Sequence, residues 1–79
     1  MNPISNQLMR AVLARLEAER QEALAIIELY LNAAVGVSDH PNIVTELITA
    51  THKLAAAEEG IETLQRNFIN PTPETAENE

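Results

Sequence analysis

Cysteine is absent from this chain of 79 residues, and glycine occurs only twice. Without cysteine the chain forms no disulfide and no thiolate metal site, and cysteine usage gives no indication of the redox compartment. Phosphate-binding loops need several glycines, and two glycines leave little room for one. These two shortages exclude disulfide scaffolds, zinc sites built on cysteine and glycine-loop nucleotide binding.

Aromatic and basic residues are also scarce. The chain has one Tyr, one Phe and no Trp, and five basic residues stand against twelve acidic ones, for a net charge of −7. This is the wrong sign for holding phosphates, and no aromatic platform is present on which bases would stack. Aromatic anchors typical of tight interfaces are missing too. We therefore expect no direct nucleic-acid binding, and an aliphatic surface toward any protein partner.

Long hydrophobic runs are lacking as well. The opening segment MNPISNQLMR has no charged stretch followed by an apolar one, and apolar runs elsewhere are only a few residues long. We expect neither a signal peptide nor a membrane span, and cytoplasmic localisation as the default. Size and composition are compatible with a bacterial or viral accessory protein.

What the chain has in abundance is helix-forming residues. A first helix is predicted over about 4–35, a stretch without Gly or Pro that is dense in Ala, Leu, Glu, Gln and Arg. Its start has two candidate caps, Asn2 with the following proline or Ser5 with the following asparagine. Gly36 suits the position after the helix end, where a left-handed conformation costs glycine least.

Pro41 suits the first turn of a second helix, predicted over about 41–69. The turn is then residues 36–41, and residues 1–69 form one helical unit. Residues 70–79 carry two prolines, three glutamates and little to bury, which predicts a disordered acidic tail.

Each predicted helix carries one apolar series with alternating steps of four and three, as in a coiled coil. The first series is Met9, Leu13, Leu16, Arg20, Ala23, Ile27, Tyr30 and Ala34, and the second is Ile43, Leu47, Ala50, Leu54, Ala57, Ile61, Leu64 and Phe68. In an antiparallel arrangement the two series face each other without a mismatch, from Met9 opposite Phe68 to Ala34 opposite Ile43. The fold-back then lies between Ser38 and Asp39. The predicted fold class is all-α, an antiparallel two-helix hairpin.

Further apolar residues lie outside these facing series. They are Val12, Leu24, Ile26, Leu31 and Val35 on the first helix, with Val44 and Ile48 on the second. A lone hairpin would leave these side chains in water, and large exposed apolar patches usually mark an interface. We expect a homodimer or higher homo-oligomer, most simply a four-helix bundle with these residues in the interface. A monomer with an unusually apolar surface is the alternative.

Arg20 is the only charged member of the facing series. It lies opposite Ala57, with Glu58 and Glu62 on neighbouring turns. One interpretation is a polar residue that fixes the register, and the other is a stem that packs while the guanidinium reaches a glutamate or water. Neither interpretation includes catalysis, because no nucleophile or acid–base partner accompanies the arginine.

In the predicted turn, Asp39 and His40 are not fully explained by ending or starting a helix. We therefore regard them as a candidate contact point for a partner. The spacings by which helical bundles bind metals, Glu-x-x-His and His-x-x-x-His, do not occur at His52 or His40. No Ser/His/Asp grouping has supporting context, and a helical hairpin lacks the concave pocket that small-molecule chemistry requires. We expect no catalytic residues, no cofactor and no metal site, and therefore no enzyme.

The remaining hypotheses concern binding. The first is a small structural or interaction protein, a homo-oligomeric helical hairpin that acts as an adaptor, assembly factor or assembly chaperone for a protein partner. The alternative is an acidic inhibitor or nucleic-acid mimic that occupies a basic groove on another protein, which requires one continuous acidic face.

Overall fold

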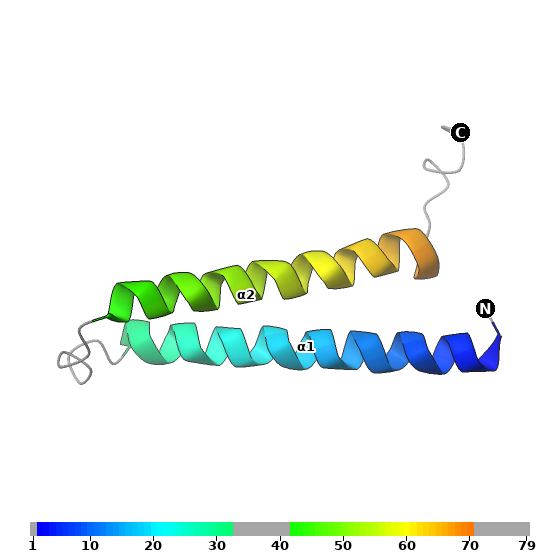
Figure 1. The fold of residues 1–79 in the computed structure, drawn as a ribbon, viewed down its shortest axis with the longest axis horizontal. Helices are drawn as coiled ribbons and strands as arrows, with labels where there is room; N and C mark the ends of the chain where they lie inside the picture. Colours follow the sequence, from blue (N-terminus) through cyan, green and yellow to red (C-terminus); the bar gives the residue numbers. More distant parts are fainter. Residues whose placement is uncertain (1, 33–41, 71–79) are drawn as a thin grey trace, which may run out of the picture.

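The computed structural model describes residues 2–32 and 42–70. Its two α-helices, α1 (Pro3–Asn32) and α2 (Ile43–Leu64), lie side by side and run in opposite directions (Figure 1). A short π-helix, η1 (Gln65–Ile69), continues α2. No strand occurs within the two described segments. The predicted all-α class is confirmed for this part of the chain.

Several sequence predictions fall outside the described residues. These are the turn at 36–41 with Asp39 and His40, the end of the first helix including Val35, and positions 71–79 of the tail.

Asn2 caps the beginning of α1. Its side-chain Oδ1 accepts a hydrogen bond from the backbone N–H of Ser5 at 2.8 Å, and its carbonyl accepts one from the N–H of Asn6 at 2.9 Å. Pro3 follows as the first helical residue, where the missing N–H of proline has no cost. Of the two predicted caps, the structure uses the first.

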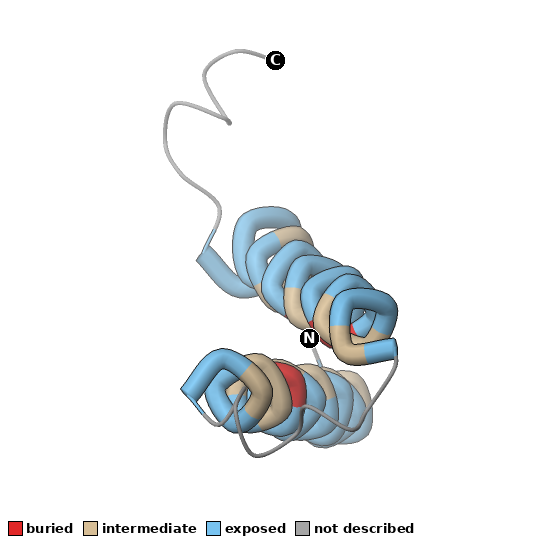
Figure 2. Tube along the Cα trace, turned by 90° about the vertical axis from the view of Figure 1, so that its left-hand side faces the viewer, coloured by how far each residue is buried: buried red, intermediate tan, exposed pale blue. Residues whose placement is uncertain are grey.

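Small side chains form the buried centre between the helices. Ala23, Ala50 and Ala57 are only 2–3% exposed, and they are the buried hydrophobic residues of the described segments (Figure 2). The larger members of the predicted facing series are half-buried: Met9, Leu13, Leu16, Arg20, Ile27, Tyr30, Ile43, Leu47, Leu54, Ile61 and Leu64. The predicted series therefore identify the residues between the helices.

Three contacts define the register of α1 against α2. Tyr30 hydrogen-bonds to Glu46, and Arg20 Nη1 lies 3.9 Å from Glu58 Oε2. Near the other end, a Cβ placed on Gly60 would lie 3.3 Å from Leu16 Cδ1. Each pair is within one residue of the predicted pairing.

Phe68 departs from the prediction, because it is 60% exposed. It lies in η1, where the N–H of Asn70 donates to the carbonyl of Gln65, five residues earlier, at 2.6 Å. A π turn holds more residues than an α turn, so it rotates the side chains that follow away from the α-helical phase. The half-buried part of the α2 series consequently ends at Leu64, although Phe68 still lines a hollow together with Met9, its predicted partner.

Candidate interaction surface

The described helices present two different outer faces, one on each side of the plane that contains both axes. Residues at alternating steps of four and three lie on one helix face. We call one the Arg15 face; it consists of Leu8, Val12, Arg15, Glu19, Glu22, Ile26 and Leu29 of α1 with Thr49, Lys53, Ala56 and Gly60 of α2. We call the other the Arg20 face; it consists of Arg10, Glu17, Gln21, Leu24, Glu28 and Leu31 of α1 with Val44, Ile48, Ala55, Glu58 and Glu62 of α2, and the guanidinium of Arg20 reaches it.

Contacts between the helices show which stripes share a side. Glu22 of α1 and Lys53 of α2 line the same groove, which joins them on the Arg15 face. The ion pair between Arg20 of α1 and Glu58 of α2 shows that the stripe of α2 that contains Glu58 lies on the Arg20 face.

The predicted interface residues are distributed over both faces. Val12 and Ile26 lie on the Arg15 face. The other described members lie on the Arg20 face, and they are Leu24, Leu31, Val44 and Ile48. Leu31 and Val44 are 65% and 66% exposed, whereas Leu24 is half-buried. These residues were predicted from the sequence as one interface. In the structure they form two separate surfaces.

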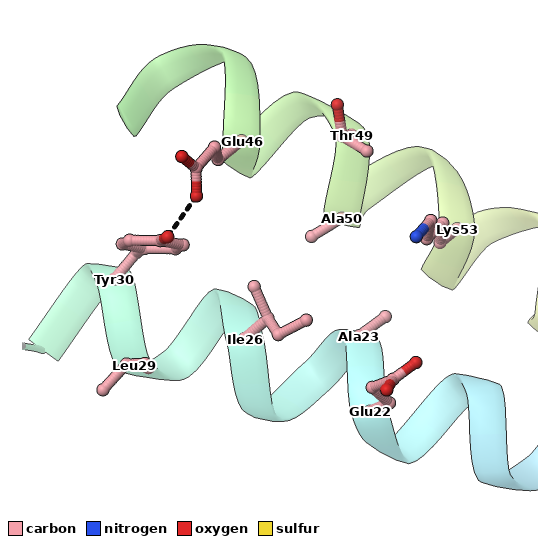
Figure 3. Close-up of a pocket in the computed structure, with 9 residues that line it drawn as sticks. All are labelled: Glu22, Ala23, Ile26, Leu29, Tyr30, Glu46, Thr49, Ala50 and Lys53. Carbon is pink, nitrogen blue, oxygen red and sulfur yellow. Dashed lines mark hydrogen bonds between the residues drawn. The ribbon is translucent and has the colours of Figure 1, made fainter. Parts of the chain in front are cut away.

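A groove of about 290 Å³ opens on the Arg15 face. Ile26 and Ala50 form its apolar part, and Glu22 and Lys53 lie on opposite helices at one end (Figure 3). Leu29, at the rim, is 59% exposed. The groove therefore suits an aliphatic side chain of a partner that also carries a charged group nearby.

Arg20 connects the two helices on the other face. Its Nε and Nη2 donate to Glu17 at 3.0 and 2.9 Å, and Gln21 also donates to the Glu17 carboxylate at 2.9 Å. The Arg20 and Gln21 hydrogen bonds hold the pKa of Glu17 at about 2, below its ordinary value of 4.5. With Glu58 at 3.9 Å and a side chain 30% exposed, Arg20 packs its stem and directs its charged group to glutamates at the edge.

The other residue predicted to join this network lies elsewhere. Glu62 accepts a hydrogen bond from Arg66 on the next turn at 3.0 Å. An i, i+4 partner on the same helix is closer than the neighbouring helix, which explains why Glu62 does not reach Arg20.

The hydrogen bond from the Tyr30 hydroxyl to the Glu46 carboxylate was not anticipated (Figure 3). This contact and the partial burial of the ring raise the pKa of Tyr30 above its ordinary value of 10. The sequence contained the information for this contact, because the predicted register puts Tyr30 opposite Leu47, the neighbour of Glu46. The bond links the two helices near the end that leads into the turn.

The described residues hold no group of three or more His, Cys, Asp or Glu side chains that would bind a metal ion. Neither α1 nor α2 is long and apolar enough to cross a membrane. His52 is exposed on α2. The described surface combines exposed aliphatic side chains with charged ones, some of which form ion pairs.

Comparisons with protein families, curated proteins and solved structures found no match to this chain. The two faces and their residues are consequently the basis for a functional proposal.

Proposed function

We propose that this protein is a non-catalytic structural or interaction protein, a homodimeric helical hairpin that acts as an adaptor, assembly factor or assembly chaperone. Two copies would form a four-helix bundle and leave apolar surface for a further protein partner.

The observation that carries this proposal is the contrast between the buried and the exposed apolar residues. Three alanines are buried among the described residues, whereas large aliphatic and aromatic side chains stay in water. Those at least 39% exposed are Ile4, Leu8, Val12, Leu29, Leu31, Val44, Ile48, Phe68 and Ile69. Burying a side chain of this size yields about 1.5–3 kcal/mol. Association is the direct way to gain this free energy.

Two separate apolar faces support an adaptor in particular. A protein that only dimerises needs one such face, whereas an adaptor needs one for its second copy and one for its client. Leu31, Val44 and Ile48 on the Arg20 face and Leu8, Val12 and Leu29 on the Arg15 face satisfy this requirement.

The distribution of charge favours this function over an acidic inhibitor or nucleic-acid mimic. Arginines are interleaved with the glutamates, and Arg15 lies 3.5 Å from Glu19 just as Arg66 pairs with Glu62. A mimic of nucleic acid would need carboxylates that are free of such neutralising partners along one face.

Light scattering coupled to size-exclusion chromatography tests the proposal directly. We expect a dimer mass and a helical circular dichroism spectrum at micromolar concentration. A helical monomer at every concentration would contradict the proposal. For the client, affinity capture from the native host with wild-type protein and Val44→Lys distinguishes specific partners, because only those that bind the Arg20 face are lost with the variant.

A further inference from the structure

The Arg15 face has the same chemical order from either end of α1. Leu8 and Val12 form an apolar pair at one end, and Ile26 and Leu29 form one at the other. The residues between them are charged, and they are Arg15, Glu19 and Glu22. Such a face is complementary to itself when α1 of a second copy crosses it in the opposite direction, which a two-fold axis perpendicular to α1 produces.

Placing the axis at Glu19 brings matching side chains together. Leu8 meets Leu29 of the second copy, and Val12 meets the second copy's Ile26. Between these apolar contacts, Arg15 meets Glu22 of the second copy, and the same contact occurs twice. Most residues of this pairing are open to water in the single chain, since Leu8 is 62% and the Arg15 side chain 83% exposed, whereas Ile26 is half-buried.

The α2 part of the same face is compatible with this axis. Gly60 and Ala56 lie two residues on either side of Glu58, and Glu58 is level with Glu19 in the observed register. An axis through Glu19 therefore also brings Ala56 against Gly60 of the second copy. The exposed Ala56 has a small side chain, which leaves room for α2 of the second copy, whereas Gly60 is partly covered by Leu16 of its own chain.

The groove on the Arg15 face accommodates apolar side chains of the second copy. The second copy's Leu8 and Val12 arrive over Leu29 and Ile26, which line a groove of about 290 Å³ whose same end also holds Tyr30 and Glu46. Insertion of aliphatic side chains between residues of a facing helix is the packing of four-helix bundles.

Charge in the middle of the face is balanced, although the chain as a whole carries −7. Each copy contributes Arg15 and Lys53 against Glu19 and Glu22, and the groove lining places Lys53 beside both glutamates. Two glutamates approach each other at the axis, but each already has its own Arg15 at 3.5 Å. The middle of the interface is therefore neutral.

We propose that the homodimer forms through the Arg15 face, with the two α1 helices antiparallel and crossing at Glu19. The inference rests on the proposed function, from which it takes the homodimer. The other symmetric arrangement, with both turns at the same end, places Leu8 and Val12 over Thr63 and Asn67 of the second copy, which are polar. The Arg20 face stays open for the client.

Cross-linking tests the position of the axis, because the natural chain has no cysteine to compete. Glu19→Cys puts two thiols near the axis, and a short bismaleimide should convert the variant to a covalent dimer. Ile48→Cys, an exposed position on the Arg20 face, should remain uncross-linked at the same concentration. A dimer by light scattering in which only Ile48→Cys cross-links overturns the chosen face and leaves the proposed function standing. A monomer by light scattering contradicts both.

A charge exchange tests the pairing of Arg15 with Glu22. Arg15→Glu places like charges together twice per dimer and should weaken association about tenfold, since opposite-charge contacts contribute up to about 1 kcal/mol each. Adding Glu22→Arg should restore association. Arg10→Glu on the Arg20 face changes the net charge equally and should leave association unchanged. Equal weakening by Arg10→Glu, or no rescue in the double variant, contradicts the pairing, and circular dichroism checks that each variant is helical.

Discussion

Leu16 of α1 lies directly over Gly60 of α2, so close that a Cβ on the glycine would be 3.3 Å from Leu16 Cδ1. This distance is shorter than ordinary van der Waals contact, and the leucine end would have to move by a few tenths of an ångström. The missing side chain of Gly60 thus leaves the space that the end of Leu16 occupies.

Gly60→Ala tests this contact. Alanine in a helix is about 1 kcal/mol more favourable than glycine, but the new methyl group displaces Leu16. We expect a gain in the free energy of unfolding clearly below 1 kcal/mol in the wild-type background and close to 1 kcal/mol when Leu16→Ala is also present. Urea unfolding of the four proteins measures both values. Equal gains in the two backgrounds would mean that Leu16 exerts no constraint.

Acid should weaken the fold through Glu17. Its pKa in the folded chain is about 2, lowered from 4.5 by the hydrogen bonds from Arg20 and Gln21. A carboxylate with a lowered folded pKa contributes stability above its unfolded pKa, and this contribution disappears as the pH falls from about 4.5 to about 2. Glu17→Gln should therefore reduce the acid dependence of Tm in this interval.

The matched control for Glu17→Gln is Glu59→Gln, which removes the same charge from an exposed position on α2. Thermal melts followed by circular dichroism from pH 6 to pH 2 make the comparison. The same flattening of the pH profile in both variants would contradict a specific contribution from Glu17.

Alkaline pH should act through Tyr30. Its hydrogen bond to Glu46 raises the pKa of the phenol above 10. A group with a raised folded pKa contributes stability below its unfolded pKa and loses this contribution as the pH rises through the folded value. The near-ultraviolet absorbance of phenolate reports this ionisation alone, because the chain has one Tyr and no Trp.

Glu46→Gln removes the charged acceptor, so the absorbance midpoint of Tyr30 should move back toward 10. Glu28→Gln, on the other face of α1, removes one charge without touching this bond and should leave the midpoint unchanged. Identical titrations of wild-type protein and Glu46→Gln would contradict the interhelical hydrogen bond.

The spacing of the helices should depend on Ala57. It is 2% exposed between α1 and α2, so a leucine there overfills the contact and should lower the free energy of unfolding by about 1–3 kcal/mol. Ala55→Leu adds the same atoms at an exposed position on the same helix and should change stability by less than about 0.5 kcal/mol. Similar urea midpoints for the two variants would contradict the placement of Ala57 between the helices.

Much of the fold was predictable because helical periodicity is strong in this chain. The alternating series from Met9 to Tyr30 and from Ile43 to Leu64 identified the facing residues and their register, since these depend only on spacing along each helix. The exposure of Phe68 was not predictable, because the π turn at 65–69 arises from local hydrogen bonding that leaves no pattern in hydrophobicity.

The candidate surface was predictable in part of its composition but not in its arrangement, and the exposed Leu8 and Leu29 were missed. Val12, Ile26, Val44 and Ile48 were recognised as apolar residues outside the facing series. Their division into two faces depends on which side of the helix pair each stripe occupies, and the contacts of Lys53 and the Arg20 guanidinium reveal this. The Tyr30–Glu46 bond, in contrast, was within reach of the sequence, because the predicted register puts Tyr30 opposite Leu47, the neighbour of Glu46.

The three buried alanines also constrain how this sequence is able to change. Only glycine is smaller, and it costs about 1 kcal/mol in a helix, whereas any larger residue forces α1 and α2 apart. Substitutions that keep the hairpin are therefore tolerated less at Ala23, Ala50 and Ala57 than at exposed positions. Descendants of this sequence are thus able to acquire new binding specificities while they keep the same interhelical distance.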